Sequence, residues 1–295
     1  SMVTVLQEPM RLYDFAWPER FSSRACRHGV LCYFDSGEIS TTSEDPPLVL
    51  LHALGVNFTE WRHVAQVLAP QQRLIGIDLP GCGHSAKPRH RWQLSDMTEA
   101  VIGLLDELGL TRAMIAGHSF GGRIAAELAL RSPERVAGLL LLNSAGFIRY
   151  PKLLASVGKR LLKPQLVAPI MVAMSKPILG TIVAHPTSPS GEFVSSVTDR
   201  FRPEFAWDFA YHACPLLPAL LSDVLDEIPR LRLPIEVVWG RSDRLLRYRS
   251  VESHLSRLPQ VRIDVIDDCG HMPNFEQPTR VAQAARRLAQ RVRLA

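Results

Sequence analysis

A single serine stands among glycines in the stretch AGHSFGG, residues 116–122. The pattern Gly-x-Ser-x-Gly, formed here by Gly117, Ser119 and Gly121, follows an apolar run and precedes a helical pattern. Glycine permits a sharp turn with close backbone approach, and such a strand-to-helix turn can present a serine hydroxyl as a nucleophile. Backbone N–H groups at the start of the helix would lie where negative charge develops. The motif on its own also occurs in ordinary turns, so its partner residues matter.

A serine hydroxyl becomes an effective nucleophile only when a base removes its proton and an acid orients that base. Of the ten histidines, His271 lies between the last predicted strand and the last predicted helix, in DDCGHMPNFEQP. This position puts it at the same sheet edge as Ser119. Asp243 follows the strand predicted over 235–239, so its carboxylate could accept a hydrogen bond from His271. The strand that ends at Asn143 offers no carboxylate, and we predict a triad of Ser119, Asp243 and His271.

Near-continuous apolar runs mark the elements that must position these residues. Such runs are typical of parallel strands covered on both faces. Helical patterns lie between them, one over 96–109 with Asp96 and Glu99 in capping-box spacing and one over 121–133. Repeated strand–helix–strand units predict an open sheet whose ligands gather at the carboxyl ends of the strands. The predicted strands are 47–52, 73–79, 112–118, 136–143, 234–240 and 261–266.

The alternation of strands and helices stops after residue 143. Residues 146 to about 230 hold many prolines and helical apolar segments but no convincing strand. We therefore predict an α/β fold with a mostly parallel, doubly wound sheet, in which residues 1–145 and 231–295 form the core domain. A helical cap inserted over 146–230 would cover the carboxyl edge of that sheet.

Length and composition are typical of an ordinary globular protein, with 295 residues, 46% hydrophobic and 21% charged. The formal net charge is +5 and the pI is near 9.1. Much of this excess lies in a final predicted helix with Val281, Ala285, Leu288 and Val292 on one face. A solvated helix explains the charge, with an anionic membrane surface as the alternative. No basic run alternates with aromatic residues, so we expect no nucleic-acid partner.

The cysteines and the apolar segments indicate the setting in which the chain works. Five scattered cysteines without paired spacing argue against a disulfide framework or a zinc site, and a reducing cytoplasm is expected. The most apolar stretch, 166–184, is interrupted by Pro169, Lys176 and Pro177. A membrane span needs about 20 nearly uninterrupted apolar residues, so no transmembrane segment is expected.

The order Ser119, Asp243, His271 resembles the α/β-hydrolase superfamily, in its serine-nucleophile, esterase- and lipase-like branch, over nearly the whole chain. DLPGCGHSAKP is similar to that family's loop after the fourth strand, and GHMPNFEQP to its Gly-His-x-x-x-x-Glu-x-Pro ending. LLHALG corresponds to the oxyanion loop, usually His-Gly-x-Gly, which implies the N–H groups of Leu54 and Phe120 as oxyanion donors. Ala53 replaces the first glycine and would cost about 1 kcal/mol if that position required a positive φ.

The same resemblance implies acyl transfer to water without a metal or organic cofactor. Dehalogenase and epoxide-hydrolase branches use an aspartate nucleophile, so Ser119 disfavours both. Relatives that cleave carbon–carbon bonds often carry a tryptophan after the histidine of the last loop, and an asparagine where this chain has His118.

Aromatic side chains in 201–212 form two faces of a predicted helix within the cap. One face carries Phe201, Phe205, Phe209 and His212, and the other carries Trp207 and Tyr211. The first face either packs the cap onto the core or walls an apolar acyl pocket, together with the region of Met171 and Met174. The residues expected to contact substrate are His52, Phe205, Trp207, Phe209 and His212.

These residues favour a serine hydrolase that cleaves a neutral, lipophilic carboxylic ester. A thioesterase, an amidase, an acyltransferase or a carbon–carbon hydrolase could use the same triad. A ligand receptor without catalytic activity is a further alternative, which would account for Ala53. The expected partner is a small-molecule ester or thioester, and the oligomeric state is left open.

Overall fold

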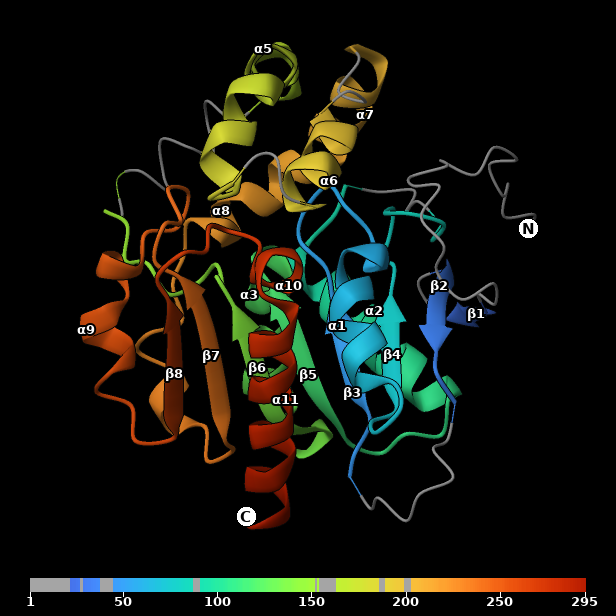
Figure 1. Cartoon of the computed structure of the whole chain (residues 1–295). Coiled ribbons are helices and arrows are strands. Elements are labelled where there is room, and N and C mark those ends of the chain that lie inside the picture. The colour runs from blue at the N-terminus through green and yellow to red at the C-terminus, as the bar shows by residue number, and fades with distance from the viewer. Residues whose placement is uncertain are drawn as a thin grey trace.

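The structure is a computed structural model, and it describes residues 22–26, 29–37, 45–86, 91–151, 153, 163–185, 189–198 and 203–295. In these residues eight strands form one sheet in the order β1-β2-β4-β3-β5-β6-β7-β8 (Figure 1). The pairs β1–β2 and β2–β4 are antiparallel, and every other neighbouring pair is parallel. The strands are β1 Ser22–Cys26, β2 Gly29–Asp35, β3 Leu48–Leu51, β4 Leu74–Ile77, β5 Ala113–His118, β6 Val136–Leu142, β7 Ile235–Gly240 and β8 Val261–Ile266.

All six predicted strands are present, and the expected mostly parallel sheet is confirmed. The antiparallel strands β1 and β2 were not predicted. β1, at the edge of the sheet, reads SSRAC and lacks an apolar run. β2 lies between β1 and β4 and reads GVLCYFD, an apolar run that the sequence analysis missed. Strands β3 to β7 are buried along their whole length, which explains their continuous apolar sequences.

Helices cover both faces of the sheet and create two apolar cores. Alternate residues of one strand face opposite layers: Leu48 and Leu50 pack in one core, Val49 and Leu51 in the other. The first core contains residues of α1 and α11, and the second contains residues of α2 and α3. The bounds are α1 Arg62–Leu68, α2 Leu94–Glu107, α3 Phe120–Arg131, α9 Glu252–Leu255, α10 Pro273–Glu276 and α11 Pro278–Arg293.

The start of α2 differs from the prediction. The helix begins at Leu94, and Gln93 donates its backbone N–H to Asp96 Oδ2 at 2.8 Å. Asp96 is therefore the acidic residue that accepts the N–H group of the N-cap residue, Gln93. It is not itself the N-cap of a capping box with Glu99, as the sequence spacing suggested.

The last helix, α11, buries the apolar face predicted from its sequence, with Val281 and Leu288 fully enclosed. Part of its positive charge has a structural use. Arg287 Nε and Arg291 Nη1 donate to the buried carboxylate of Glu236 on β7, at 3.1 and 2.8 Å. These ion pairs fasten the helix to the sheet.

The helices between β6 and β7 lie at the end of the sheet where the parallel strands finish (Figure 1). They are α5 Pro164–Ile182, α6 Pro189–Thr198, α7 Pro203–Ala213 and α8 Leu217–Leu220. In the described part of this insertion no strand occurs, and no described helix of the chain is long and apolar enough to cross a membrane.

Candidate active site

Ser119 occupies a strained turn between β5, which ends at His118, and α3, which begins at Phe120. Its backbone has φ 51° and ψ −111°, values that a residue with a side chain rarely adopts. Hydrogen bonds hold the turn in place, because Ser119 N donates to Leu142 O at 2.9 Å and Ser119 O accepts from Ala145 N at 3.0 Å. The strain marks Ser119 as a residue that the surrounding fold forces into position.

The two outer glycines of the motif are required by packing. A Cβ at position 117 would lie 2.3 Å from Gly121 O, and a Cβ at position 121 would lie 2.2 Å from Leu51 O. Real Cβ atoms do not approach backbone so closely. The spacing Gly-x-Ser-x-Gly therefore lets α3 start directly against β5 and β3.

Asp243 and His271 form a buried pair, with Asp243 Oδ2 2.7 Å from His271 Nδ1. The other carboxylate oxygen, Oδ1, accepts the N–H groups of Leu245 and Leu246 at 2.8 and 2.9 Å. Burial alone would raise the pKa of Asp243, but the charge and hydrogen bond of His271, together with the hydrogen bonds from Asn143 and the Leu246 N–H, lower that pKa overall. Asp243 is consequently an anion that orients the ring of His271.

Asn143, which the sequence analysis set aside, completes the surroundings of this carboxylate. Its Nδ2 donates to Asp243 Oδ2 at 2.6 Å and its Oδ1 accepts from Gly240 N at 3.1 Å. Its backbone has φ 39°, a left-handed conformation that asparagine tolerates better than most residues. The sequence indicated this role only through the position of Asn143 after the carboxyl end of β6. In the sequence analysis that position was considered only as a place for the acidic residue of the triad.

The loop that carries His271 is fixed from both sides. His118 Nε2 lies 2.7 Å from His271 O, which puts this loop against the residue that precedes Ser119. On the other side Glu276 accepts the N–H groups of Gly270 and Met272 at 3.0 and 3.2 Å. Sequence analysis assigned no role to Glu276.

The same loop contacts the inserted helices. His271 N donates to Ile182 O at the end of α5, at 2.6 Å, and Ala184 N donates to Glu276 Oε2 at 2.9 Å. Among the described residues no hydrogen bond joins the Ser119 hydroxyl to the His271 ring. Catalytic hydrogen bonds are often long without substrate and tighten when it binds.

The loop after β3 takes a conformation that suits its sequence. Among the described residues other than glycine, a positive φ occurs only at Ser119 and Asn143, so Ala53 avoids the predicted backbone cost. Gly55 supplies the left-handed residue of this loop, with φ 83°. Leu54 lies between Ala53 and Gly55. The N–H group of Ala53 donates to Glu60 Oε1 at 3.0 Å.

His52 is buried and uses both ring nitrogens on backbone groups. Its Nδ1 lies 2.7 Å from Ala53 O, and its Nε2 accepts from Leu79 N at 3.0 Å. This tautomer ties the loop after β3 to the loop after β4. The ring therefore supports the loop, and we drop His52 from the expected substrate contacts.

The aromatic residues of α7 separate into the two predicted faces. A Cβ at Gly55 would lie 3.5 Å from the ring of Phe209, so this ring covers the loop that carries Leu54, and Phe205 stacks on it at 6.1 Å. His212 stacks on Trp92 at 5.2 Å. Trp207 is 46% exposed, which is unlike a pocket wall, and we drop it too. Phe201 lies outside the described residues.

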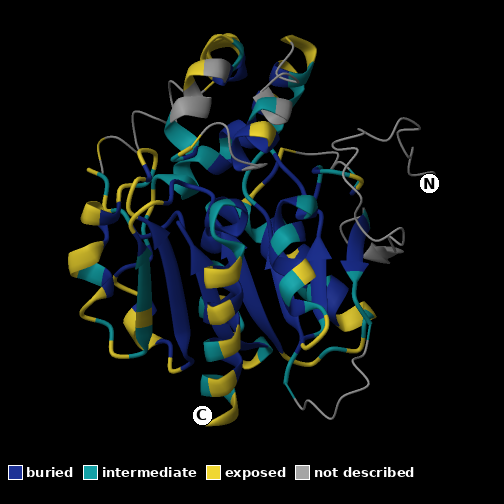
Figure 2. Ribbon diagram, viewed as in Figure 1, coloured by how far each residue is buried: buried dark blue, intermediate teal, exposed yellow. Residues whose placement is uncertain are grey.

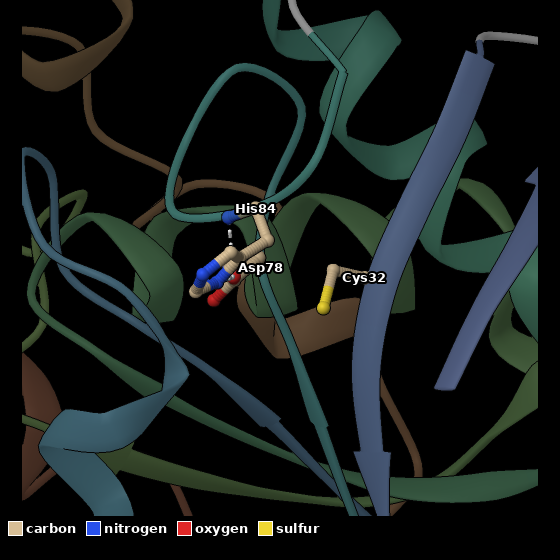
Figure 3. Close-up of side chains that lie close together, drawn as sticks. All are labelled: Cys32, Asp78 and His84. Carbon is tan, nitrogen blue, oxygen red and sulfur yellow. Dashed lines mark hydrogen bonds and ion pairs between the residues drawn. The ribbon is translucent and has the colours of Figure 1, made fainter. Parts of the chain in front are cut away.

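One further cluster brings together atoms that metals bind. Cys32, Asp78 and His84 each offer a ligand atom, and these atoms lie within 4.8 Å of one another (Figure 3). The Asp78 oxygens already accept the N–H groups of Phe58 and His84, at 2.9 and 2.8 Å. Burial, aided by the charge of Asp78, raises the pKa of Cys32 to about 12, which favours the thiol over the metal-binding thiolate. The cluster serves to clamp the loop after β4, and the expectation of no cofactor stays a prediction.

Comparison with known proteins assigns the family. Residues 46–278 match the family model described as alpha/beta hydrolase fold. The chain belongs to this family. The alpha/beta hydrolase fold accounts for the parallel strands whose carboxyl ends carry Ser119, Asp243 and His271.

Three known proteins are similar to this chain. A "dihydrolipoyllysine-residue acetyltransferase component of acetoin cleaving system" of Pseudomonas putida is 31% identical over 80% of this chain, which spans 61% of that relative's length. A "2-hydroxy-6-oxononadienedioate/2-hydroxy-6-oxononatrienedioate hydrolase 2" of Pseudomonas putida is 28% identical, over 83% of this chain and 86% of its own. A thermophilic esterase from Thermogutta terrifontis superposes with a TM-score of 0.75 at 23% identity, over 92% and 99% of the two chains.

The contacts of Asn143 predict the effect of removing its side chain. Asn143→Gly suits the left-handed backbone, but it removes one of the two donors to Asp243 Oδ2 and the side-chain acceptor of Gly240 N–H. It should lower the free energy of unfolding by about 1–3 kcal/mol. Asn143→Ala adds backbone strain and should cost about 1 kcal/mol more. Urea denaturation measures both, and an Asn143→Gly variant as stable as the wild type would contradict this role.

Proposed function

We propose that this protein is a serine hydrolase that cleaves a carboxylic ester through an acyl-enzyme intermediate. The observation that carries the proposal is the buried Asp243–His271 pair, whose loop is held against the strained turn of Ser119. An oriented imidazole beside a serine in such a turn is the arrangement that activates a hydroxyl.

In the first half of the reaction Ser119 Oγ attacks the ester carbonyl carbon while His271 Nε2 takes the hydroxyl proton. Asp243 holds Nδ1–H and stabilises the imidazolium that results. The carbonyl oxygen becomes an oxyanion, and the N–H groups of Leu54 and Phe120 are proposed to bind it. His271 then gives its proton to the departing alkoxide, which leaves as the alcohol.

In the second half a water molecule attacks the acyl-enzyme. His271 takes one proton from this water and returns it to Ser119 Oγ when the ester bond to the serine breaks. The products are a carboxylic acid and the restored enzyme. The water supplies the oxygen and hydrogen that the two products gain, so no cofactor takes part in these steps.

The inserted helices are proposed to act as a cap, residues 146–230, that forms the acyl pocket. Phe209 lies against the loop of Leu54, and Phe205 stacks on Phe209, so apolar rings line the approach to the proposed oxyanion site. Such a lining favours a neutral, lipophilic acyl group. His212 stays a proposed contact because it follows Phe209 by three residues on α7, on the helix face predicted to carry both.

A carbon–carbon hydrolase is the second candidate, because one relative at 28% identity is named as an oxononadienedioate hydrolase. The same triad would serve this reaction. Carbon–carbon hydrolases often have asparagine at the position of His118. The histidine in this chain therefore favours ester hydrolysis.

Labelling with a fluorophosphonate tests the proposed nucleophile. The wild-type protein should be labelled on the peptide that contains Ser119, and Ser119→Ala should abolish labelling. His271→Ala should slow labelling about 10²–10⁴-fold because the base is lost. Ser242→Ala, which changes an exposed serine beside the triad acid, is the matched control and should label like the wild type.

Substrate assays then separate the reactions. p-Nitrophenyl butyrate should be hydrolysed faster than butyryl-coenzyme A or a 2-hydroxy-6-oxo-dienoate. A folded wild-type protein that is never labelled, or labelling that persists in Ser119→Ala, would sink the proposal. Preference for the dienoate would establish the second candidate.

A further inference from the structure

Glu60 and His118 form a buried ion pair beside the proposed triad. Their side chains are 0% and 1% exposed, and His118 Nδ1 lies 3.1 Å from Glu60 Oε2 and 3.2 Å from Glu60 Oε1. Neither residue has a role in the proton transfers described above. Buried ion pairs are costly to desolvate and often no more stable than apolar replacements, so this one calls for a reason.

The contacts of His118 define its protonation. Nδ1 faces a carboxylate and Nε2 faces the carbonyl oxygen of His271, at 2.7 Å. Both partners only accept hydrogen bonds, so both ring nitrogens must carry a hydrogen. Burial by itself lowers the pKa of His118, but the charge and hydrogen bond of Glu60 and the His271 carbonyl raise it overall. His118 is therefore an imidazolium.

The pair reaches three segments of the proposed site. Glu60 Oε1 accepts Ala53 N at 3.0 Å, one residue before the proposed oxyanion donor Leu54. His118 directly precedes Ser119, and its Nε2 donates to His271. Leu54, Ser119 and His271 thus each adjoin or belong to a residue of the pair or one that it contacts.

We propose that Glu60 and His118 are positioning residues that hold the oxyanion loop, the turn of Ser119 and the backbone of His271 in their relative places. This inference rests on the proposed function. Side-chain contacts across three loops are needed because each loop follows a different strand, and backbone hydrogen bonds within the sheet stop where the strands end. A misplacement of about 1 Å at such a site costs about 10²-fold in rate.

Two substitutions at Glu60 separate the effect of its hydrogen bonds from the effect of its negative charge. Glu60→Gln keeps every hydrogen bond, since its carbonyl accepts Ala53 N–H and its amide donates to Nδ1 of a neutral His118. This variant should keep kcat within about threefold. Glu60→Ala removes these bonds and should lower kcat for p-nitrophenyl butyrate about 10²-fold with KM nearly unchanged. If Glu60→Ala does not fold, His118→Asn replaces it, because asparagine can donate toward Glu60 but has no atom where Nε2 reaches His271.

Glu236→Ala is the matched control. It removes a fully buried carboxylate that pairs with Arg287 and Arg291, on an element outside the site, and should destabilise the protein without changing kcat. The positioning role is wrong if Glu60→Ala or its replacement keeps kcat, or loses no more than Glu236→Ala.

Nitrogen-15 NMR of histidine-labelled protein tests the pair without any activity. His118 should show two protonated ring nitrogens at pH 8 in the wild type and one in Glu60→Gln. A neutral His118 in the wild type would overturn the ion pair even if the protein is labelled at Ser119. A protein that is never labelled but shows this imidazolium would instead refute the proposed function alone.

A different observation concerns the outer surface of α5. Leu166, Ile170 and Met174 are 51%, 59% and 44% exposed, and the four-residue spacing puts them on one face of the helix. Pro169, Ala173 and Pro177, also exposed, fall on this face. The opposite face packs against α7 through Ala168 and Val172. Figure 2 shows exposed residues along α5 at the end of the molecule farthest from C-terminal Ala295.

The charged residues of the segment that carries this apolar face are all basic. Residues 146–185 contain six lysines and arginines and no aspartate or glutamate. Arg149 is paired with Asp223 and Asp226, while Lys163 is exposed at the start of α5. The neighbouring helix α7 contributes the acidic residues Glu204 and Asp208.

We infer that the exposed face of α5 docks on an anionic lipid surface, with the helix lying in the plane of the interface. An exposed apolar face on a segment whose charged residues are all basic is what such a surface attracts. A second copy of this chain fits less well, because a two-fold contact through α5 would bring two basic segments together. This inference does not depend on the proposed chemistry.

Sedimentation with vesicles tests the lipid surface. At low salt the protein should partition at least about tenfold more onto phosphatidylglycerol–phosphatidylcholine vesicles than onto phosphatidylcholine alone. Leu166→Ser/Ile170→Ser should lose about tenfold of this binding, and Leu294→Ser, at an exposed leucine of the C-terminus, should lose none. Equal binding to both vesicles, or a double variant that binds like the wild type, would overturn the inference. The inference would also be overturned if the wild-type protein bound no vesicles but formed a dimer that the double variant dissociates.

Discussion

The hydrogen bond between Asp243 and His271 joins loops that follow two different strands, and it lies in the interior of the protein. A buried carboxylate keeps its charge only when donors surround it. Here Asn143, two backbone N–H groups and the ring of His271 supply them. The position and tautomer of the proposed base follow from this arrangement, and the site would lose its geometry if any of these loops moved.

The sheet explains why residues so distant along the chain meet. Parallel strands place all their carboxyl ends on one edge, and the loops after β5 to β8 carry the polar residues Ser119, Asn143, Asp243 and His271. Both features were predictable from the sequence, because strands buried on both faces read as continuous apolar runs and the polar residues follow them directly. The prediction that Ser119, Asp243 and His271 lie at one edge of the sheet was inferred in this way.

The supporting contacts were not predictable. Glu60 lies in a short segment without any motif, and only the folded loops show that its carboxylate meets His118 and Ala53. Asn143 follows a strand as expected, but its partner is 100 residues away. The family pattern suggested that the backbone of Ala53 could need a positive φ, whereas the structure places the positive φ of that loop at Gly55. Such features depend on three-dimensional neighbours, which spacing along one chain does not encode.

The most direct test of the account is a crystal structure of the protein after reaction with a phosphonate ester. It should show phosphorus bonded to Ser119 Oγ, one phosphonyl oxygen between the N–H groups of Leu54 and Phe120, and His271 Nε2 within hydrogen-bond distance of the phosphonate. An unmodified Ser119, or a phosphonyl oxygen that points away from both N–H groups while the His271 ring stays out of reach, would contradict it.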